Sequence, residues 1–181
     1  MEVFGGPLWV HYGQAYVLCG DSEVPDLENA FRGQVNGLCG TAVSGTMFLM
    51  TGLHTGHVGF TIEVSASPPA LDRSWEEIVE ASFLVAVAPV ALYQWGEASG
   101  QPLPLSPGQY RARYSARSMQ GGHDQDTLVG DAAVIDEYLL QLWPAPAVSD
   151  QVIRQTSAVA AYWHNFASGL PRTDTTGRLG Q

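Results

Sequence analysis

Two histidines three residues apart are the sequence's candidate for metal chemistry. His54 and His57 lie in the segment Gly52-Leu-His-Thr-Gly-His, and two imidazoles at this spacing in a loop can bind zinc. A zinc site also needs a third ligand, and no spacing pattern designates one. The residues that could supply it are Cys39, His123 and Glu63. The alternative, which we favour, is that both histidines form local hydrogen bonds in a hairpin loop. We therefore predict no cofactor.

The two cysteines, Cys19 and Cys39, could bind a metal together, or one of them could act as a nucleophile with His11. Neither lies beside cations or at the start of an evident helix, the settings that lower the pKa of a thiol. No serine lies in the strand–turn–helix context of a nucleophile. We therefore predict that both cysteines are small buried side chains and that the protein is not an enzyme.

A row of arginines is the third chemical candidate. After the turn at Pro107-Gly108 the residues alternate, with Tyr110, Ala112, Tyr114 and Ala116 on one face of a strand. The opposite face carries Arg111, Arg113, Ser115 and Arg117, and so three of the chain's eight cationic side chains. These guanidinium groups could bind an anionic ligand. The alternative is cross-strand pairing with Glu137 or another carboxylate.

The overall charge is strongly negative, at −10 from 18 acidic and 8 basic residues, none of them lysine. This balance argues against nucleic-acid binding, which needs clustered cations. It suits a protein that meets a basic partner. The candidate contact residues lie in two acidic segments. They are Asp21, Glu23, Asp26 and Glu28 in the first and Asp124 and Asp126 in the second.

The periodicity predicts a mainly β protein, an antiparallel β-sandwich with a C-terminal α-helix packed on it. We expect one domain over residues 1–168 and a flexible tail over 169–181. The predicted helix spans about 149–168, capped by Ser149 or Asp150. The predicted strands are 8–19 with a bulge at Gly13, 38–43, 46–51, 58–65, 78–87, 90–95, 108–117 and 134–143. A helical turn is predicted at 25–31, a hairpin loop at 52–56 and another at 118–133.

The N-terminal residues contain neither a basic region nor a long apolar run, so we expect no signal peptide. No stretch reaches the roughly 18 apolar residues of a membrane span, and we expect no membrane association. The expected location is the cytoplasm, with both thiols reduced. The oligomeric state is left open.

Three segments in this order resemble the competence protein J family, small bacterial proteins described as inhibitors of a DNA-entry nuclease. The segments are Val10-His-Tyr-Gly-Gln-Ala-Tyr-Val, Leu105-Ser-Pro-Gly-Gln-Tyr-Arg-Ala-Arg and Asp136-Glu-Tyr-Leu-Leu-Gln-Leu-Trp. The resemblance covers about residues 8–146, and uncharacterised actinobacterial proteins share the same strand plan. It implies a non-catalytic protein-binding module, an acidic inhibitor or immunity-type regulator of a nuclease or toxin.

Two other functions stay open. One is a small-molecule or carbohydrate-binding β-sandwich that uses exposed tryptophans or the row of arginines. The other is a metal-dependent enzyme built on His54 and His57.

Overall fold

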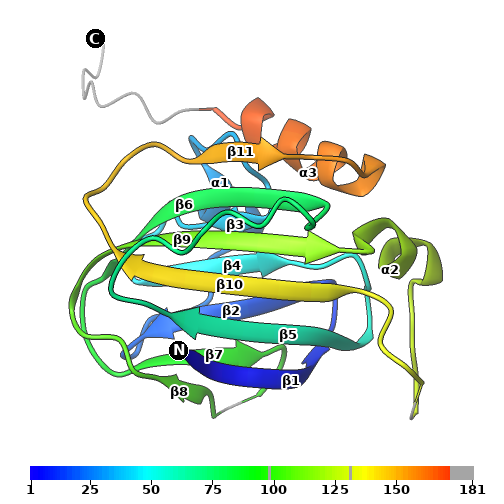
Figure 1. Ribbon diagram of the computed structural model, residues 1–181, viewed down its shortest axis with the longest axis horizontal. Helices are drawn as coiled ribbons and strands as arrows, with labels where there is room; N and C mark the ends of the chain where they lie inside the picture. The colour runs from blue at the N-terminus through cyan, green and yellow to red at the C-terminus, as the bar shows by residue number, and fades with distance from the viewer. Residues whose placement is uncertain (98, 131, 172–181) are drawn as a thin grey trace, which may run out of the picture.

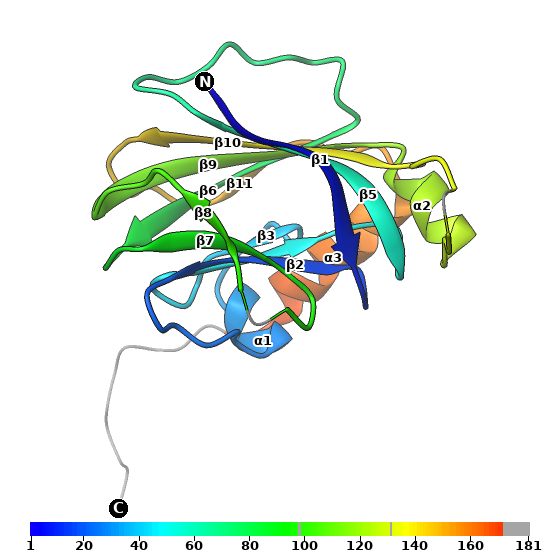
Figure 2. The same ribbon diagram turned by 90° about the horizontal axis from the view of Figure 1, so that it is seen from below.

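The fold was analysed in a computed structural model that describes residues 1–97, 99–130 and 132–171. The protein is mainly β, with 43% of the described residues in strands and 14% in helices. The strands form two curved sheets that lie one above the other in Figure 2. None of the helices in the described ranges is long and apolar enough to cross a membrane.

The larger sheet has six strands (Figure 1). In spatial order they are β1 (Glu2–Val10), β5 (Gly56–Val64), β10 (Glu137–Pro144), β9 (Gly108–Arg117), β6 (Glu77–Val85) and β11 (Gln151–Arg154). β10 pairs with β5 in parallel, while the other neighbours are antiparallel. The predicted wholly antiparallel arrangement is therefore wrong. A parallel pair needs a long crossover connection, and here the whole chain between β5 and β10 supplies it.

The smaller sheet has five strands, all paired antiparallel. In spatial order they are β3 (Cys39–Gly40), β4 (Thr46–Met50), β2 (Gln14–Cys19), β7 (Val90–Gln94) and β8 (Gln101–Leu103). The short helix α1 (Leu27–Phe31) lies on the face of this sheet that points away from the larger one (Figure 2). Asp26 caps α1 by accepting a hydrogen bond from the Asn29 backbone at 2.8 Å, so the helical turn predicted at 25–31 is confirmed.

One cluster of buried apolar side chains contains residues of both sheets. Within it, the rings of Tyr114 and Tyr138 stack with centroids 5.6 Å apart, and Phe60 lies 6.2 Å from each. The alternation of β9 accordingly places Tyr110 and Tyr114 in the core, as predicted. Tyr114 also donates its hydroxyl to the Met50 carbonyl of the smaller sheet at 3.0 Å, which joins the two layers by a buried hydrogen bond.

Two predicted connections differ from the structure because the chain changes sheets there. Residues 8–19 are not one bulged strand: they split at Tyr12 and Gly13, both with positive φ, into β1 and β2 of different sheets. Likewise the segment 52–56 is not a hairpin loop, since β4 and β5 also belong to different sheets. Alternation alone cannot distinguish a strand that continues from one that turns into another sheet.

The connection 118–133 contains the helix α2 (Met119–Gln125), where a loop was predicted. Two glycines in seven residues give this segment a low helix propensity, so the sequence carries no helix signal. Close packing against neighbouring segments explains why glycines occur in and beside this helix. A side chain at Gly122 would collide with the Asp136 carboxylate, and one at Gly52 would collide with the Met119 carbonyl.

The predicted helix start at Ser149 or Asp150 is wrong. Residues 151–154 form β11, and the helix α3 (Ala158–Gly169) begins after Ser157, whose hydroxyl accepts from the Ala160 backbone at 3.1 Å. The cause is the buried carboxylate of Glu77, which accepts hydrogen bonds from the Thr156 and Ser157 backbones at 3.0 and 2.7 Å. It holds the turn that separates β11 from α3. Residues 172–181 of the predicted tail lie outside the described residues.

The arginine face of β9 is covered, and a single carboxylate from β6 serves two of its cations. Glu80 accepts a hydrogen bond from Arg111 Nε at 3.0 Å and another from Arg113 Nε at 2.9 Å. Their exposed fractions are 7% for Glu80, 4% for Arg111 and 7% for Arg113. Burial alone would raise the pKa of Glu80, but the hydrogen bonds from Arg111, Arg113 and Gln151 outweigh it and lower that pKa.

Backbone carbonyls complete this ion cluster because one carboxylate cannot satisfy two guanidinium groups. Arg111 donates to the Ser149 carbonyl at 3.0 Å, and Arg113 donates to the Pro69 carbonyl at 3.0 Å. Arg113 also lies over the Trp143 ring, 5.1 Å from its centroid. The cluster thereby fixes two connections, the one before β6 that contains Pro69 and the one after β10 that contains Ser149.

We expect Glu80→Gln to lower the free energy of unfolding by about 3–5 kcal/mol, since it leaves two buried cations without a counter-charge. Urea denaturation measures this change. The matched control is Glu137→Gln, which breaks the exposed pair with Arg117 at 3.5 Å and should cost at most about 1 kcal/mol. Because the pKa of Glu80 is lowered on folding, its stabilisation should be lost as the pH falls. Equal losses in the two variants would contradict this role.

His164 holds α3 against the segment before β3. Its Nδ1 accepts a hydrogen bond from the Gly37 backbone at 3.0 Å, so the ring is neutral and carries its proton on Nε2. A side chain at Gly37 would collide with the Trp163 carbonyl, which shows how closely the two segments approach. Burial lowers the pKa of His164 to about 4, although Asp150 acts in the opposite direction.

Because folding lowers the pKa of His164, the unfolded chain binds a proton at a higher pH than the folded protein does. The free energy of unfolding therefore decreases as the pH is lowered. Lowering the pH from 7 to 4 should therefore reduce the free energy of unfolding by about 2 kcal/mol through His164. Chemical denaturation at a series of pH values measures it. His164→Asn keeps an acceptor for the Gly37 backbone and should remove this part of the slope. A variant that retains the full slope would contradict the assignment.

Candidate functional site

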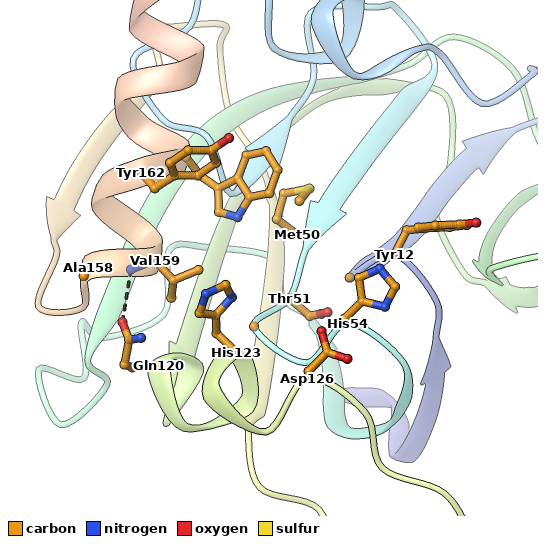
Figure 3. Close-up of a pocket in the computed structure, with 13 residues that line it drawn as sticks. Tyr12, Met50, Thr51, His54, Gln120, His123, Asp126, Ala158, Val159 and Tyr162 are labelled. Carbon is orange, nitrogen blue, oxygen red and sulfur yellow. Dashed lines mark hydrogen bonds between the residues drawn. The ribbon is translucent and has the colours of Figure 1, made fainter.

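A cavity of about 430 Å³ opens beside α2 and α3, and we call it the α2–α3 cavity. Figure 3 shows its walls: Ala158, Val159 and Tyr162 come from α3, and Gln120 and His123 come from α2. The opposite wall is formed by Tyr12 of the β1–β2 turn and by the segment after β4. The full lining is Tyr12, Gly13, Met50, Thr51, Gly52, His54, Gln120, His123, Asp126, Ala158, Val159, Tyr162 and Trp163.

A buried hydrogen-bond network fixes the segment after β4, which forms part of the cavity wall. The Tyr138 hydroxyl accepts from the Gly52 backbone and donates to Asp136, both at 2.6 Å. Asp136 also accepts from the Leu53 backbone at 3.0 Å. Burial raises the pKa of Asp136 although these hydrogen bonds oppose it, and burial likewise raises the pKa of Tyr138. The network gives the segment after β4 one fixed course, so the cavity is part of the folded framework.

The two histidines considered as metal candidates have different partners. His57 lies on β5 and contacts Trp9, with ring centroids 5.1 Å apart. His54 lines the α2–α3 cavity, and its Nδ1 lies 2.8 Å from the Thr55 hydroxyl, which also lies 2.7 Å from His11 Nδ1. One hydroxyl can donate to only one nitrogen, so at least one of these two rings carries a proton on Nδ1. Over the described residues, no group of three metal-binding side chains is found.

A second hollow, of about 660 Å³, carries the first acidic segment. Asp21 and Glu23 line it together with Glu97, and Tyr16 and Tyr93 are also in its lining. All three carboxylate residues are exposed. We call this hollow the acidic groove. Its tyrosines face each other across the paired strands β2 and β7.

The other predicted acidic residues fall into two places. Asp26 and Glu28 lie together at α1, where Asp26 is the cap and Glu28 pairs with Arg32 at 3.8 Å. Asp124 lies on α2 and accepts from Gln120 at 2.8 Å. Asp126 ends α2 with φ of 62° and lines the α2–α3 cavity. The structure therefore separates the two acidic segments into different surfaces.

The remaining candidates have internal partners. Arg111 and Arg113 are buried in the ion cluster with Glu80. Arg117 pairs with Glu137 and lies over Trp75, 4.7 Å from its ring centroid. Cys19 and Cys39 are buried free thiols. Burial raises the pKa of Cys39 to about 12 and also raises that of Cys19, so neither is a poised nucleophile.

Sequence reasoning missed most of the α2–α3 cavity. Tyr12, Tyr162 and Trp163 come from a turn and a helix that are far apart in the chain. Glu97 of the acidic groove was missed as well, because it is an isolated acid within a glycine-rich loop. A local signal exists only for Tyr162, a large aromatic side chain on the polar face of α3 that is 62% exposed.

Comparisons with known proteins give likenesses of structure. No family model and no curated protein matches the sequence. ComJ from Bacillus subtilis, described as an inhibitor of the DNA degrading activity of NucA, superimposes with a TM-score of 0.54 and 16% identity. The match covers 80% of this chain and 98% of ComJ. A protein described as crocagin biosynthetic gene J gives a TM-score of 0.51 and 13% identity, over 78% and 96% of the two chains.

Identities at this level show a common fold and leave function open. Both matched proteins are almost wholly covered, so the common fold is the whole of each neighbour and not a fragment. The resemblance to competence protein J is thus confirmed in structure: this chain has a ComJ-like fold.

Proposed function

We propose that this protein is a non-catalytic protein-binding module that inhibits a nuclease or toxin with a cationic surface. The observation that carries the proposal is the acidic groove, where three exposed acidic residues, Asp21, Glu23 and Glu97, line one hollow. The likeness to ComJ, a nuclease inhibitor by its description, supports the same role.

The charge of the folded protein favours this role more than its composition alone. Two of the eight arginines are buried with Glu80, and so they do not offset the surface carboxylates. Asp21, Glu23 and Glu97 thus contribute to a surface of one sign. A field of this kind attracts a cationic protein and raises its association rate, more strongly at low salt.

The aromatic surface of the acidic groove suits the same partner. Tyr93 is partly exposed in this hollow, whereas Tyr16 is buried, with 6% of its surface exposed. An arginine side chain can pair with a carboxylate while it stacks on the Tyr93 ring. Arginines and lysines that a nuclease uses to hold phosphates would be occupied in this way. Inhibition would then follow from exclusion of DNA, with no chemical step on this chain.

The test is a triple variant, Asp21→Asn, Glu23→Gln and Glu97→Gln, which removes three charges from the acidic groove. Binding to a cationic nuclease recovered with the protein from its host should weaken at least about tenfold. The salt dependence of Kd should flatten, and inhibition of DNA degradation should decline in parallel.

The matched control removes the same number of exposed charges elsewhere, through Glu2→Gln, Asp72→Asn and Glu137→Gln. It should change Kd only slightly, since long-range charge alone contributes little at physiological salt. If both triple variants weaken binding equally, the acidic groove is not the docking site. If neither changes binding or its salt slope, charge complementarity is refuted as the basis of recognition.

A further inference from the structure

We infer that the α2–α3 cavity binds a small organic cation with an apolar body, an alkylammonium or alkylguanidinium compound. Its volume of about 430 Å³ falls within the range of small-molecule sites. It shares no lining residue with the acidic groove, so it forms a second site, separate from the one proposed for the protein partner.

The charge of the lining selects for a cation. Among the thirteen residues that line the cavity, Asp126 alone has a formal charge when the histidines are neutral, and none is an arginine. One Asp126 oxygen accepts from the Thr127 hydroxyl at 2.8 Å. The other oxygen receives no hydrogen bond from the part of the chain that the structure describes. It is thus free to accept a charged N–H donor.

Aromatic faces select for the apolar body and strengthen the preference for a cation. On the α3 side, Tyr162 and Trp163 meet at 78° with centroids 5.1 Å apart, so their rings form a corner. On the opposite side, the His54 ring lies at the cavity, and Tyr12, which points away from the cavity in Figure 3, packs against it with centroids 5.2 Å apart. Aromatic rings attract ammonium and guanidinium ions through their faces.

The cavity is held in shape before any ligand arrives. Figure 3 shows the hydrogen bond from the Val159 backbone to Gln120, 3.1 Å long, which joins α3 to α2. The Asp126 carbonyl accepts from the His54 and Thr55 backbones at 2.9 and 3.0 Å, which ties the end of α2 to the facing wall. A site that needs little ordering loses less free energy on binding.

The experiment is calorimetric titration of the purified protein with choline and n-butylguanidinium, and with 3,3-dimethylbutan-1-ol, the uncharged carbon isostere of choline. We expect the cations to bind at least about tenfold more tightly than the isostere. Asp126→Asn, which keeps the size of the side chain and removes its charge, should abolish that preference. Tyr162→Ala should weaken cation binding about three- to tenfold. Amide NMR shifts should map the ligand to α2 and α3.

Asp124→Asn is the matched control, since it removes a charge from the same helix outside the cavity, and it should leave cation binding unchanged. Equal affinity for choline and its isostere would overturn the assignment, as would the absence of saturable binding by either cation up to about 10 mM, a range that still detects weak ligands. Asp126→Asn should retain inhibition of the nuclease. This site and the acidic groove therefore fail or succeed separately.

Discussion

The carboxylate that Glu80 shares between Arg111 and Arg113 is the constraint on which the larger sheet depends. Two buried cations with one counter-charge are stable only if further acceptors reach them. The connections before β6 and after β10 supply backbone carbonyls, and so both must cross the outer face of β9. The connection after β10 thereby reaches the free edge of β6, where β11 pairs. It also removes two positive charges from the surface.

Beyond β11, Glu77 turns the chain into α3, and α3 supplies one wall of the α2–α3 cavity. The other wall is set by Tyr138 and Asp136, which fix the segment after β4. The cavity therefore exists because two buried acidic groups position two connections at one end of the strands. The acidic groove is built differently, across β2 and β7 of the smaller sheet. Two surfaces with separate structural supports therefore lie on one small fold.

The likeness to ComJ concerns the arrangement of strands and sheets, and it gives no information about the acidic groove or the α2–α3 cavity. Fold similarity at 16% identity reflects strand order and layer packing, which many sequences satisfy. The groove carboxylates and the cavity aromatics lie on turns, loops and the exposed face of a helix, where sequences vary most. A functional argument for this chain must therefore rest on its own side chains, such as Asp21 and Asp126, and on the charge that they present.

The sequence by itself determined the mainly β class, the buried face of β9 with Tyr110 and Tyr114, the capped turn at Asp26 and the acidic character of the surface. Each of these follows from local alternation, capping or composition. Tertiary structure decided the parallel pairing of β5 with β10, the turn at Tyr12 and the helix α2. It also paired Arg111 and Arg113 with Glu80, gave His54 and His57 different partners and gathered the cavity residues. These depend on contacts between residues far apart in the chain, which no local period encodes.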